Sequence, residues 1–430
     1  MPGHRSLVFA LAFLASLAVV ACGPSTTPPT GSWPTSKPAV AAGAGTSSNG
    51  GSGSVTTNPG GTASMSGSAG ALASSGGSAG ASTTPAECGT PSTAAISVAW
   101  DAINKQPAAF YASAEARAVA DNILYYQNAD HGWPKNIDMT SRTAAKAGST
   151  IDNRGTTTQL EFLARTYGGT SCPQYRDAML GAVDFLLSAQ YENGGWPQVY
   201  PNPKDYHTHI TFNDDAMIHV LQVLRNIGAG TAPYGFVDPA LRASTMAAVA
   251  KGVECVLACQ IKMPGGQRGW CAQHDEVTLA PAQARTYELP SVSGSEGAQI
   301  VRFLMTIDPP TPEIREAVEG AVAWFEANKI TGIRIEATVD TTLASGEDRV
   351  VVEDASAPPI WARFYELETN RPFFSSRCEV PECDADPFFM RRYSLAEIDN
   401  ERRIGYAWYG NWPARALTTT YPAWRQRWAE

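Results

Sequence analysis

The first 86 residues of this chain contain no acidic residue and only two basic ones, Arg5 and Lys37. From residue 23 to residue 86 the composition is dominated by Gly, Ser, Thr, Ala and Pro, so this segment has too little apolar surface to offset the entropy cost of folding. We therefore predict a disordered linker over residues 23–86, followed by one globular domain over residues 87–430.

The domain also lacks the positive charge that nucleic-acid binding requires. The formal net charge of the whole chain is −9, and without the two basic residues of the first segment the domain carries −11. A strongly acidic balance argues against nucleic acid as a partner. An anionic polymer would have to be held by local arginines or through a bridging cation.

No apolar run near the N-terminus is long enough for a membrane span. The run from Leu7 to Val20 follows a positively charged start and is typical of an export signal, which we place at residues 1–22. The four residues from Val19 to Cys22 resemble the lipobox of bacterial lipoproteins, in which the cysteine is lipidated. Gly23 follows, without the Asp of an inner-membrane retention signal. We expect an exported lipoprotein at the outer membrane or cell surface, in contact with the membrane only through Cys22.

The cysteines show no Cys-x-x-Cys or Cys/His spacing of the kind that holds structural zinc. Of the eight cysteines, seven remain when Cys22 is set aside, so at least one stays unpaired even if export allows disulfides. Cys378 and Cys383 are the best candidates for a local disulfide.

A repeated pattern is present in the domain: a helix that ends in Gln, a short turn, and then Gly-Trp. It occurs at Gln127–Trp133, at Gln190–Trp196 and, in a longer form, at Gln260–Trp270. Helix starts such as Asp238-Pro239 and Thr311-Pro312 lie between or after these turns. The pattern predicts a mainly α fold of antiparallel helical hairpins, an irregular α/α toroid. We expect the three tryptophans to pack helix ends, with a role as sugar platforms as the alternative.

Residues 332–353 interrupt the helical pattern. Gly332 to Val339 and Arg349 to Glu353 alternate between apolar and polar side chains on either side of Ala344-Ser-Gly346. This alternation predicts a small β-hairpin insertion.

Two acid–amide pairs stand just ahead of helical segments. Asn213, Asp214 and Asp215 precede an amphipathic stretch, and Asp152-Asn153 precedes another, for which Thr156 and Gln159 suggest a capping box. One interpretation is structural: Asn213 caps the helix and the acids of its first turn complement the helix dipole. The other is a functional site.

Several dispersed motifs occur in the same order as in a known family. They are Asn136-Ile-Asp138, Thr150-Ile-Asp-Asn153, Thr156-Thr-Thr-Gln-Leu160, His207 to Met217, Trp270-Cys-Ala-Gln-His-Asp275, Pro281-Ala-Gln-Ala-Arg-Thr-Tyr-Glu288, Pro359-Ile-Trp-Ala-Arg-Phe-Tyr365 and Thr369-Asn-Arg-Pro-Phe373. On these motifs, residues 121–412 resemble the pectate lyases of polysaccharide lyase family ten. The resemblance implies an open cleft on the toroid, calcium-dependent β-elimination of polygalacturonate, and an arginine as Brønsted base. We expect a monomer.

The resemblance also implies roles for single residues. Asp152, Asn153 and Asp214 match the calcium site, and hard oxygen donors suit Ca²⁺. Arg285 matches the base. The expected cationic clamps on neighbouring uronate carboxylates are Lys135, Arg363 and Arg371.

Residue chemistry alone favours a different base. Free arginine is protonated at neutral pH, so without the resemblance His274, His207 or Tyr287 would be chosen. Two other functions stay open at this point. One is a glycoside hydrolase that uses Asp152 and Asp214 as its acid pair, and the other is a surface uronan-binding protein without catalysis.

Overall fold

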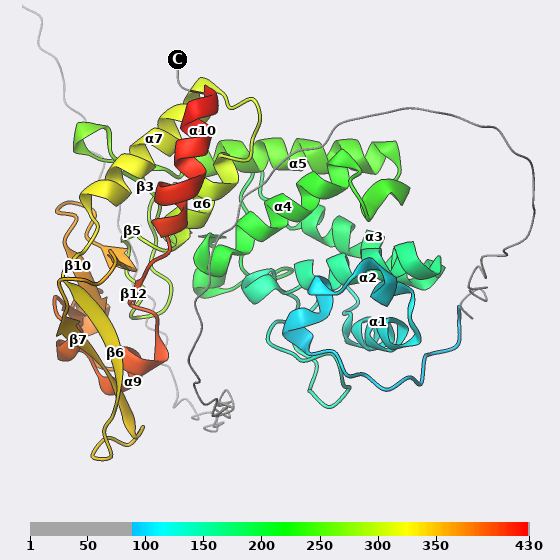
Figure 1. Ribbon diagram of the computed structural model, residues 1–430, viewed down its shortest axis with the longest axis horizontal. Helices are drawn as coiled ribbons and strands as arrows, with labels where there is room; N and C mark the ends of the chain where they lie inside the picture. Colours follow the sequence, from blue (N-terminus) through cyan, green and yellow to red (C-terminus); the bar gives the residue numbers. More distant parts are fainter. Residues whose placement is uncertain (1–87, 429–430) are drawn as a thin grey trace, which may run out of the picture. The chain divides into compact units, whose positions relative to one another are not determined.

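The computed structural model describes residues 88–428 (Figure 1). The predicted signal at residues 1–22, its Cys22, and the linker at residues 23–86 lie outside these described residues. Among residues 88–428, no helix combines the length and the apolar character that a bilayer span requires.

Helices dominate the described part of the chain, which confirms the mainly α prediction. Their bounds are α1 Ala114–Tyr126, α2 Thr157–Thr170, α3 Pro173–Ser188, α4 Ala216–Ala229, α5 Pro239–Ala258, α6 Glu296–Leu304, α7 Pro312–Ala327, α8 Glu382–Ala385, α9 Asn400–Gly405 and α10 Tyr421–Trp428. The hairpin partners α2 and α3, α4 and α5, and α6 and α7 pack against each other. Across the hairpins, α4 contacts both α2 and α6, while α3 contacts α1 and α7 contacts α5. The helices therefore form two layers, visible for α4 and α5 in Figure 1.

Local sequence signals account for several helix starts. Asp238 accepts hydrogen bonds from the backbone N–H groups of Ala240 and Leu241, so it caps α5, whose first residue is Pro239. Thr311 accepts from the N–H of Ile314 and caps α7 in the same way. Both starts agree with the sequence prediction.

Two predicted caps are wrong. Thr156 does not cap α2, because its hydroxyl donates to the carbonyl of Thr150 and accepts from the N–H of Trp133. Asn213 does not cap α4 either, because Asn213–Asp215 forms a separate 3₁₀ turn, η5, in which Asp214 and Asp215 have left-handed φ values of 50° and 61°. The acids of this turn therefore stand before the helix, not in its first turn.

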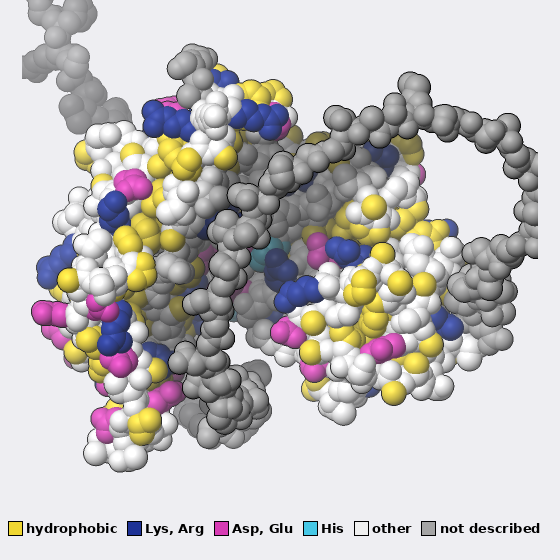
Figure 2. Space-filling model, in the orientation of Figure 1, with side chains coloured by type: hydrophobic (Ala, Val, Ile, Leu, Met, Phe, Trp, Pro, Cys, Tyr) yellow, Lys and Arg dark blue, Asp and Glu magenta, His cyan; other side chains and the backbone are white. Residues whose placement is uncertain are grey.

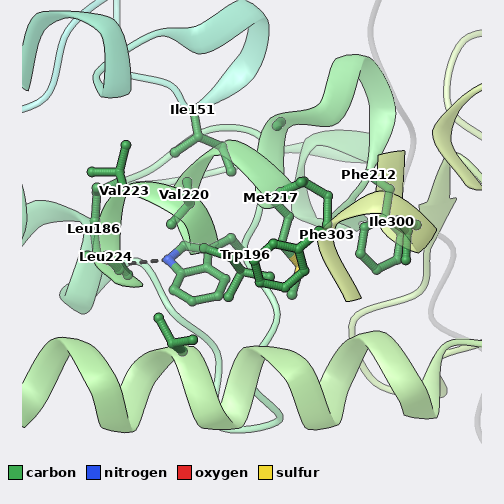
Figure 3. Packing of buried hydrophobic residues seen from close by; sticks show 14 of the residues in the cluster. Ile151, Leu186, Trp196, Phe212, Met217, Val220, Val223, Leu224, Ile300 and Phe303 are labelled. Atoms are coloured by element: carbon green, nitrogen blue, oxygen red, sulfur yellow. Dashed lines mark hydrogen bonds between the residues drawn. The ribbon is translucent and has the colours of Figure 1, made fainter. Parts of the chain in front are cut away.

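The Gln–Gly-Trp repeat organises the helical layers. Trp133, Trp196 and Trp270 are fully buried, and each indole Nε1 donates at 2.7 Å to the carbonyl of a preceding helix. Figure 3 shows this bond from Trp196 to Leu186. The glutamine side chains reach across to the next hairpin: Gln127 donates to Ala178, Gln190 to Ala248 and Gln260 to Ala317. These contacts confirm that the three tryptophans pack helix ends, because no face of them is open to a sugar.

Short strands make up the rest. They are β1 Ile210–Thr211, β2 Ile261–Lys262, β3 Arg268–Gly269, β4 Gln273–His274, β5 Val292–Ser293, β6 Ile333–Val339, β7 Glu347–Glu353, β8 Trp361–Ala362, β9 Phe364–Tyr365, β10 Pro372–Ser375, β11 Arg391–Arg392 and β12 Tyr409–Gly410. Strands β6 and β7 pair antiparallel in full register from Ile333↔Glu353 to Val339↔Glu347, which confirms the hairpin. The largest sheet has the order β11-β10-β9-β5 and lies over a second, smaller core that includes Phe364, Phe373 and Trp408.

The structure contains the one disulfide that the sequence analysis predicted and a second one that it did not. Cys378 pairs with Cys383 as predicted, and Cys88 pairs with Cys172. Among residues 88–428, Cys255, Cys259 and Cys271 are free and buried.

Candidate active site

Two adjacent turns carry the predicted acids. The 3₁₀ turn η3, Asp152–Arg154, contacts η5, Asn213–Asp215, and both contact α4. Asn153 has a left-handed φ of 47°, like Asp214 in the other turn. Left-handed residues other than glycine are uncommon, cost free energy, and concentrate at functional sites. The structure therefore brings Asp152, Asn153 and Asp214 together from positions about sixty residues apart in the chain.

Asp152 is the buried acid of this site and is only 2% exposed. Its Oδ1 accepts the N–H of Asn153 at 2.9 Å, and its Oδ2 pairs with the ammonium of Lys135. The side-chain nitrogen of Asn153 donates to Asn136 at 3.1 Å. Its side-chain oxygen accepts no hydrogen bond within residues 88–428, so it is free to act as a ligand. A carboxylate held by a cation beside a free amide oxygen is an oxygen-donor set that fits a hard metal ion.

Asp214 is more open, with 40% of its side chain exposed. Its Oδ2 accepts from the amide of Asn213 at 2.9 Å, and its Oδ1 lies 3.3 Å from Nη2 of Arg363. Arg363 is 7% exposed and also pairs with the buried Glu296. Burial works to lower the pKa of Arg363, but Glu296 and Asp214 outweigh it and raise that pKa. In this structure Arg363 therefore orients Asp214 and neutralises Glu296, and its role as a substrate clamp stays a prediction.

Asp215 shares the pocket but has a different environment. Its Oδ2 accepts from the amide of Gln299 at 2.9 Å. Burial, together with the nearby carboxylates of Glu296 and Asp214, raises its pKa to about 6. The family resemblance assigned Asp214 but not Asp215 to the calcium site, and in the structure the two neighbouring acids have different partners.

Arg285 lies in the loop before β5 and is held by Glu288. Nε of Arg285 donates to Oε2 of Glu288 at 2.7 Å, and Nη2 donates to Oε1. Burial works to lower the pKa of Arg285, but the hydrogen bonds and charge of Glu288 outweigh it and raise that pKa above its ordinary value. The arginine is therefore protonated in this structure.

Tyr406, which sequence reasoning missed, connects the arginine to the acidic turns. Its hydroxyl donates to Oε1 of Glu288 at 2.8 Å. The guanidinium of Arg363 lies 4.8 Å from the centre of its ring, and that of Arg285 lies 5.9 Å from it. Since Arg363 pairs with Asp214, one continuous set of contacts runs from Arg285 through Glu288, Tyr406 and Arg363 to Asp214.

Tyr206 is a second residue that the sequence did not single out. The pKa of Tyr206 is raised above its ordinary value, mainly by burial. The charges of Glu288 and Asp152 also raise it, and the charge of Arg285 works in the opposite direction. Its hydroxyl is therefore within electrostatic reach of both Arg285 and Asp152. The ring of His207 stacks on Tyr206 with centroids 4.1 Å apart. The sequence motif that begins at His207 is therefore the signal that could have pointed to Tyr206.

The structure does not bring Arg371 into contact with these groups. Its guanidinium lies 3.5 Å from the centre of the Tyr393 ring, and Tyr393 in turn donates to Glu366 at 2.5 Å. Among the described residues, Arg371 makes no contact with Arg285 or the acidic turns.

Two of the alternative bases have no access to a substrate. His274 is fully buried, its Nε2 accepts the N–H of Cys271 at 3.0 Å, and its Nδ1 lies 2.8 Å from the carbonyl of Leu279. Burial lowers its pKa to about 4. Tyr287 is also fully buried. His207 is half-buried, with Nδ1 3.1 Å from the carbonyl of Lys204.

The pocket at the acidic turns has a volume of about 340 Å³. It is lined by Asn153, Asp214, Asp215, Ser295, Glu296, Gln299, Arg302, Arg363 and Trp412. On the face drawn in Figure 2, basic and acidic side chains are interspersed and not separated by sign. Recognition of a charged ligand in the pocket depends on the lining itself, in which Asp214, Asp215 and Glu296 stand beside Arg302 and Arg363.

Comparison with known proteins identifies the class. The sequence model of a family described as pectic acid lyase matches residues 127–417. An alanine mutant of a family 10 polysaccharide lyase from Cellvibrio cellulosa, in complex with trigalacturonic acid, is 35% identical, with a TM-score of 0.63; the match covers 77% of this chain and 96% of that one. A second structure of the Cellvibrio cellulosa enzyme is 36% identical with a TM-score of 0.63, over 76% of this chain and 94% of the other. Among curated protein sequences there is no match.

The fold is thus that of a polysaccharide lyase. The chain belongs to the pectic acid lyase family, and it is an enzyme, a pectate lyase.

Proposed function

We propose that this enzyme cleaves polygalacturonate by calcium-dependent β-elimination, with Arg285 as the base that takes the C5 proton. The observation that supports this most is the continuous set of contacts from Arg285 through Glu288, Tyr406 and Arg363 to Asp214. It joins a candidate proton acceptor to a candidate cation site. The trigalacturonic acid bound in the Cellvibrio cellulosa complex supports the choice of polymer.

Asp152, Asn153 and Asp214 are the proposed calcium ligands. Their carboxylate and amide oxygens are the donors that Ca²⁺ prefers. Lys135 already pairs with Asp152, so this carboxylate has a positive charge beside it in the structure, which supports the proposal. The ammonium of Lys135 has to leave Asp152 before that carboxylate can hold a metal ion, and it is then available to a uronate carboxylate. Bound calcium would supply positive charge that stabilises the enolate-like charge on the reacting uronate.

The proposed elimination breaks two bonds of one sugar unit. The C5–H proton passes to a neutral guanidine nitrogen of Arg285, and the electrons of that bond form the C4=C5 double bond. The bond from C4 to the glycosidic oxygen breaks, its electron pair stays on that oxygen, and the oxygen takes a proton from water. The guanidinium of Arg285 then returns the C5 proton to solvent, which restores the neutral base. The measurement that tests the reaction is the ultraviolet absorbance of the unsaturated product, with and without EGTA. A hydrolase would release sugar ends without this absorbance, and a binding protein would release nothing.

Glu288 raises the pKa of Arg285, although Arg285 must become neutral to act as the base. In Glu288→Gln, the pKa of Arg285 should fall, because the charge that stabilises the guanidinium is gone. A base works only when deprotonated, so the rising limb of the pH profile of kcat/KM should move to lower pH. The maximal rate should fall, because Arg285 loses the partner that holds it in place. A limb that stays in place, or moves to higher pH, would contradict a base role for Arg285 in contact with Glu288.

We also propose that the two helical layers belong to an irregular α/α toroid and that the enzyme acts as a monomer. The support for the toroid is the way Gln127, Gln190 and Gln260 each reach from one hairpin to the next. A repeated contact of this kind is typical of folds built by stacking helical pairs.

The lipoprotein anchor remains a proposal that the sequence alone supports. Cys22→Ser should release the enzyme from membranes into the soluble fraction, because a lipid chain on Cys22 would be its only membrane contact. Fractionation and mass spectrometry of the N-terminus check this. A wild-type chain that is already soluble and carries no lipid would show that the anchor does not exist.

A further inference from the structure

Helix α6 presents three polar side chains to the pocket at the acidic turns. Glu296, Gln299 and Arg302 are spaced three residues apart, so they lie along one face of the helix. Glu296 pairs with Arg363, and Gln299 donates to Asp215. Arg302 makes no hydrogen bond, ion pair or ring contact with any residue from 88 to 428. A cation that lines a pocket and has no partner is available to an anionic ligand.

Trp412 lines the same pocket, two residues after β12. Its ring packs on the backbone of Gly410, where an added Cβ would lie 2.5 Å from ring atoms. The three tryptophans of the helical repeat are fully buried and donate their Nε1 to carbonyls, whereas Trp412 is partly exposed and its Nε1 has no partner among the described residues. Trp412 therefore packs against the main hydrophobic core and still keeps an exposed part and a free Nε1 for a ligand.

Ser295 supplies a third free group. Its backbone N–H donates to Ser293, but its hydroxyl has no partner within the described chain. The pocket thus offers a guanidinium, an indole and a hydroxyl that are all unused. A uronate ring needs these three: a cation for its carboxylate, a flat apolar surface for its ring, and a hydrogen-bonding partner for its hydroxyls.

We propose that Arg302, Trp412 and Ser295 form a second uronate subsite. It lies next to the sugar whose carboxylate is held through the proposed calcium ion at Asp152, Asn153 and Asp214. This inference rests on the proposed function, because it takes the ligand to be a uronate polymer. Asn153 and Asp214 line the same pocket, so one chain can occupy both places. Each sugar of such a chain carries a carboxylate, and the planar guanidinium of Arg302 can bind it through two hydrogen bonds.

Arg302→Gln tests the subsite. Its KM for polygalacturonate should rise by about ten- to a hundredfold, the range of a lost charge-assisted hydrogen bond, while kcat stays within about twofold, because the contact exists both before and during the reaction. A matched control is Arg334→Gln on β6, which removes the same charge from a surface ion pair with Glu336 and Asp354. If Arg302→Gln behaves like this control, the subsite does not exist.

Binding measured apart from turnover separates the remaining explanations. In an Arg285→Ala background with calcium, calorimetry with oligogalacturonates of increasing length should show affinity gained with length when Arg302 is present. That gain should be lost in Arg302→Gln. Trp412→Ala should lose the same gain if it keeps its thermal midpoint, and a loss equal at every length would remove Trp412 from the subsite.

Two controls distinguish a failure of the subsite from a failure of the proposed function. Calcium affinity measured without sugar should be the same in wild type and Arg302→Gln, and an equal loss there would assign Arg302 to the metal site instead. If wild type gives no unsaturated product from polygalacturonate, the proposed function fails. If wild type is active and Arg302→Gln is unchanged, only the subsite fails.

Discussion

Replacing Arg285 by lysine is expected to lower turnover by at least about a hundredfold, the scale on which enzymes lose rate without their general base. The two residues carry the same charge, but Arg285 uses both Nε and Nη2 to bind Glu288, and a single ammonium cannot reproduce that fork. Lysine also differs in reach and basicity. The change in KM should be smaller than the change in kcat, because the proton transfer occurs only in the transition state.

The assay is steady-state kinetics on polygalacturonate at alkaline pH with saturating calcium. Arg371→Ala is the companion variant, because Arg371 is an arginine of the same family pattern that stacks on Tyr393, without contact to Arg285. As a carboxylate clamp it should weaken substrate binding by about 1.5 to 3 kcal/mol and leave kcat nearly intact. Loss of kcat in both variants would mean that the two arginines act alike in the transition state, so the loss in Arg285→Lys would not identify Arg285 as the base.

Near-wild-type turnover in Arg285→Lys would return the search for the base to other residues. His274 and Tyr287 could not take over, because both are fully buried and the ring nitrogens of His274 are occupied by backbone groups. Tyr206 would become the first candidate, since the charges of Arg285 and Asp152 both affect the pKa of its hydroxyl. The kinetic result therefore decides whether Arg285 or another residue takes the proton.

The parts of the fold that the sequence predicted correctly are those fixed by local contacts. The β6–β7 hairpin follows from alternation along two short runs, and the starts of α5 and α7 follow from Asp238-Pro239 and Thr311-Pro312. The Gln–Gly-Trp turns also act over short separations, since Trp133 and Trp196 each bond a carbonyl ten residues earlier. Signals of this kind need no knowledge of the tertiary structure.

The capping predictions failed where tertiary contacts override a local preference. Asn213 ahead of an amphipathic stretch is a good cap by local rules. In the structure Arg363 holds Asp214 and Gln299 holds Asp215, from 149 and 84 residues away, and both acids adopt left-handed conformations. No local rule can anticipate those partners.

The same limit applies to the candidate site. Family motifs named Arg285, Arg363 and Asp214, but the link between them runs through Tyr406, which is 118 residues from Glu288. Tyr406 belongs to no recognisable motif, because its role depends on which side chains the fold brings near its ring and hydroxyl. The raised pKa of Asp215 has the same origin, since its burial and the nearby charge of Glu296 are properties of the folded chain.

Asp214→Asn is expected to abolish activity at low calcium. The substitution removes one of two proposed charged ligands, and calcium affinity depends on the ligand charge count, so the calcium needed for half-maximal activity should rise by about tenfold or more. Asparagine is preferable to alanine here, because it tolerates the left-handed φ of 50° at this position. The thermal midpoint should hardly move, since Asp214 makes no capping bond to α4 and is 40% exposed.

Activity measured against free calcium, buffered with EGTA, checks this expectation together with the thermal midpoint. Asp215→Asn is the matched control, because Asp215 is adjacent, shares the left-handed backbone, and bonds Gln299. If Asp214 is a ligand, its variant should need far more calcium than the Asp215 variant. Equal shifts would mean that both acids act only through their charge. A marked loss of thermal stability with normal calcium dependence would mean that Asp214 supports the turn before α4 and holds no metal.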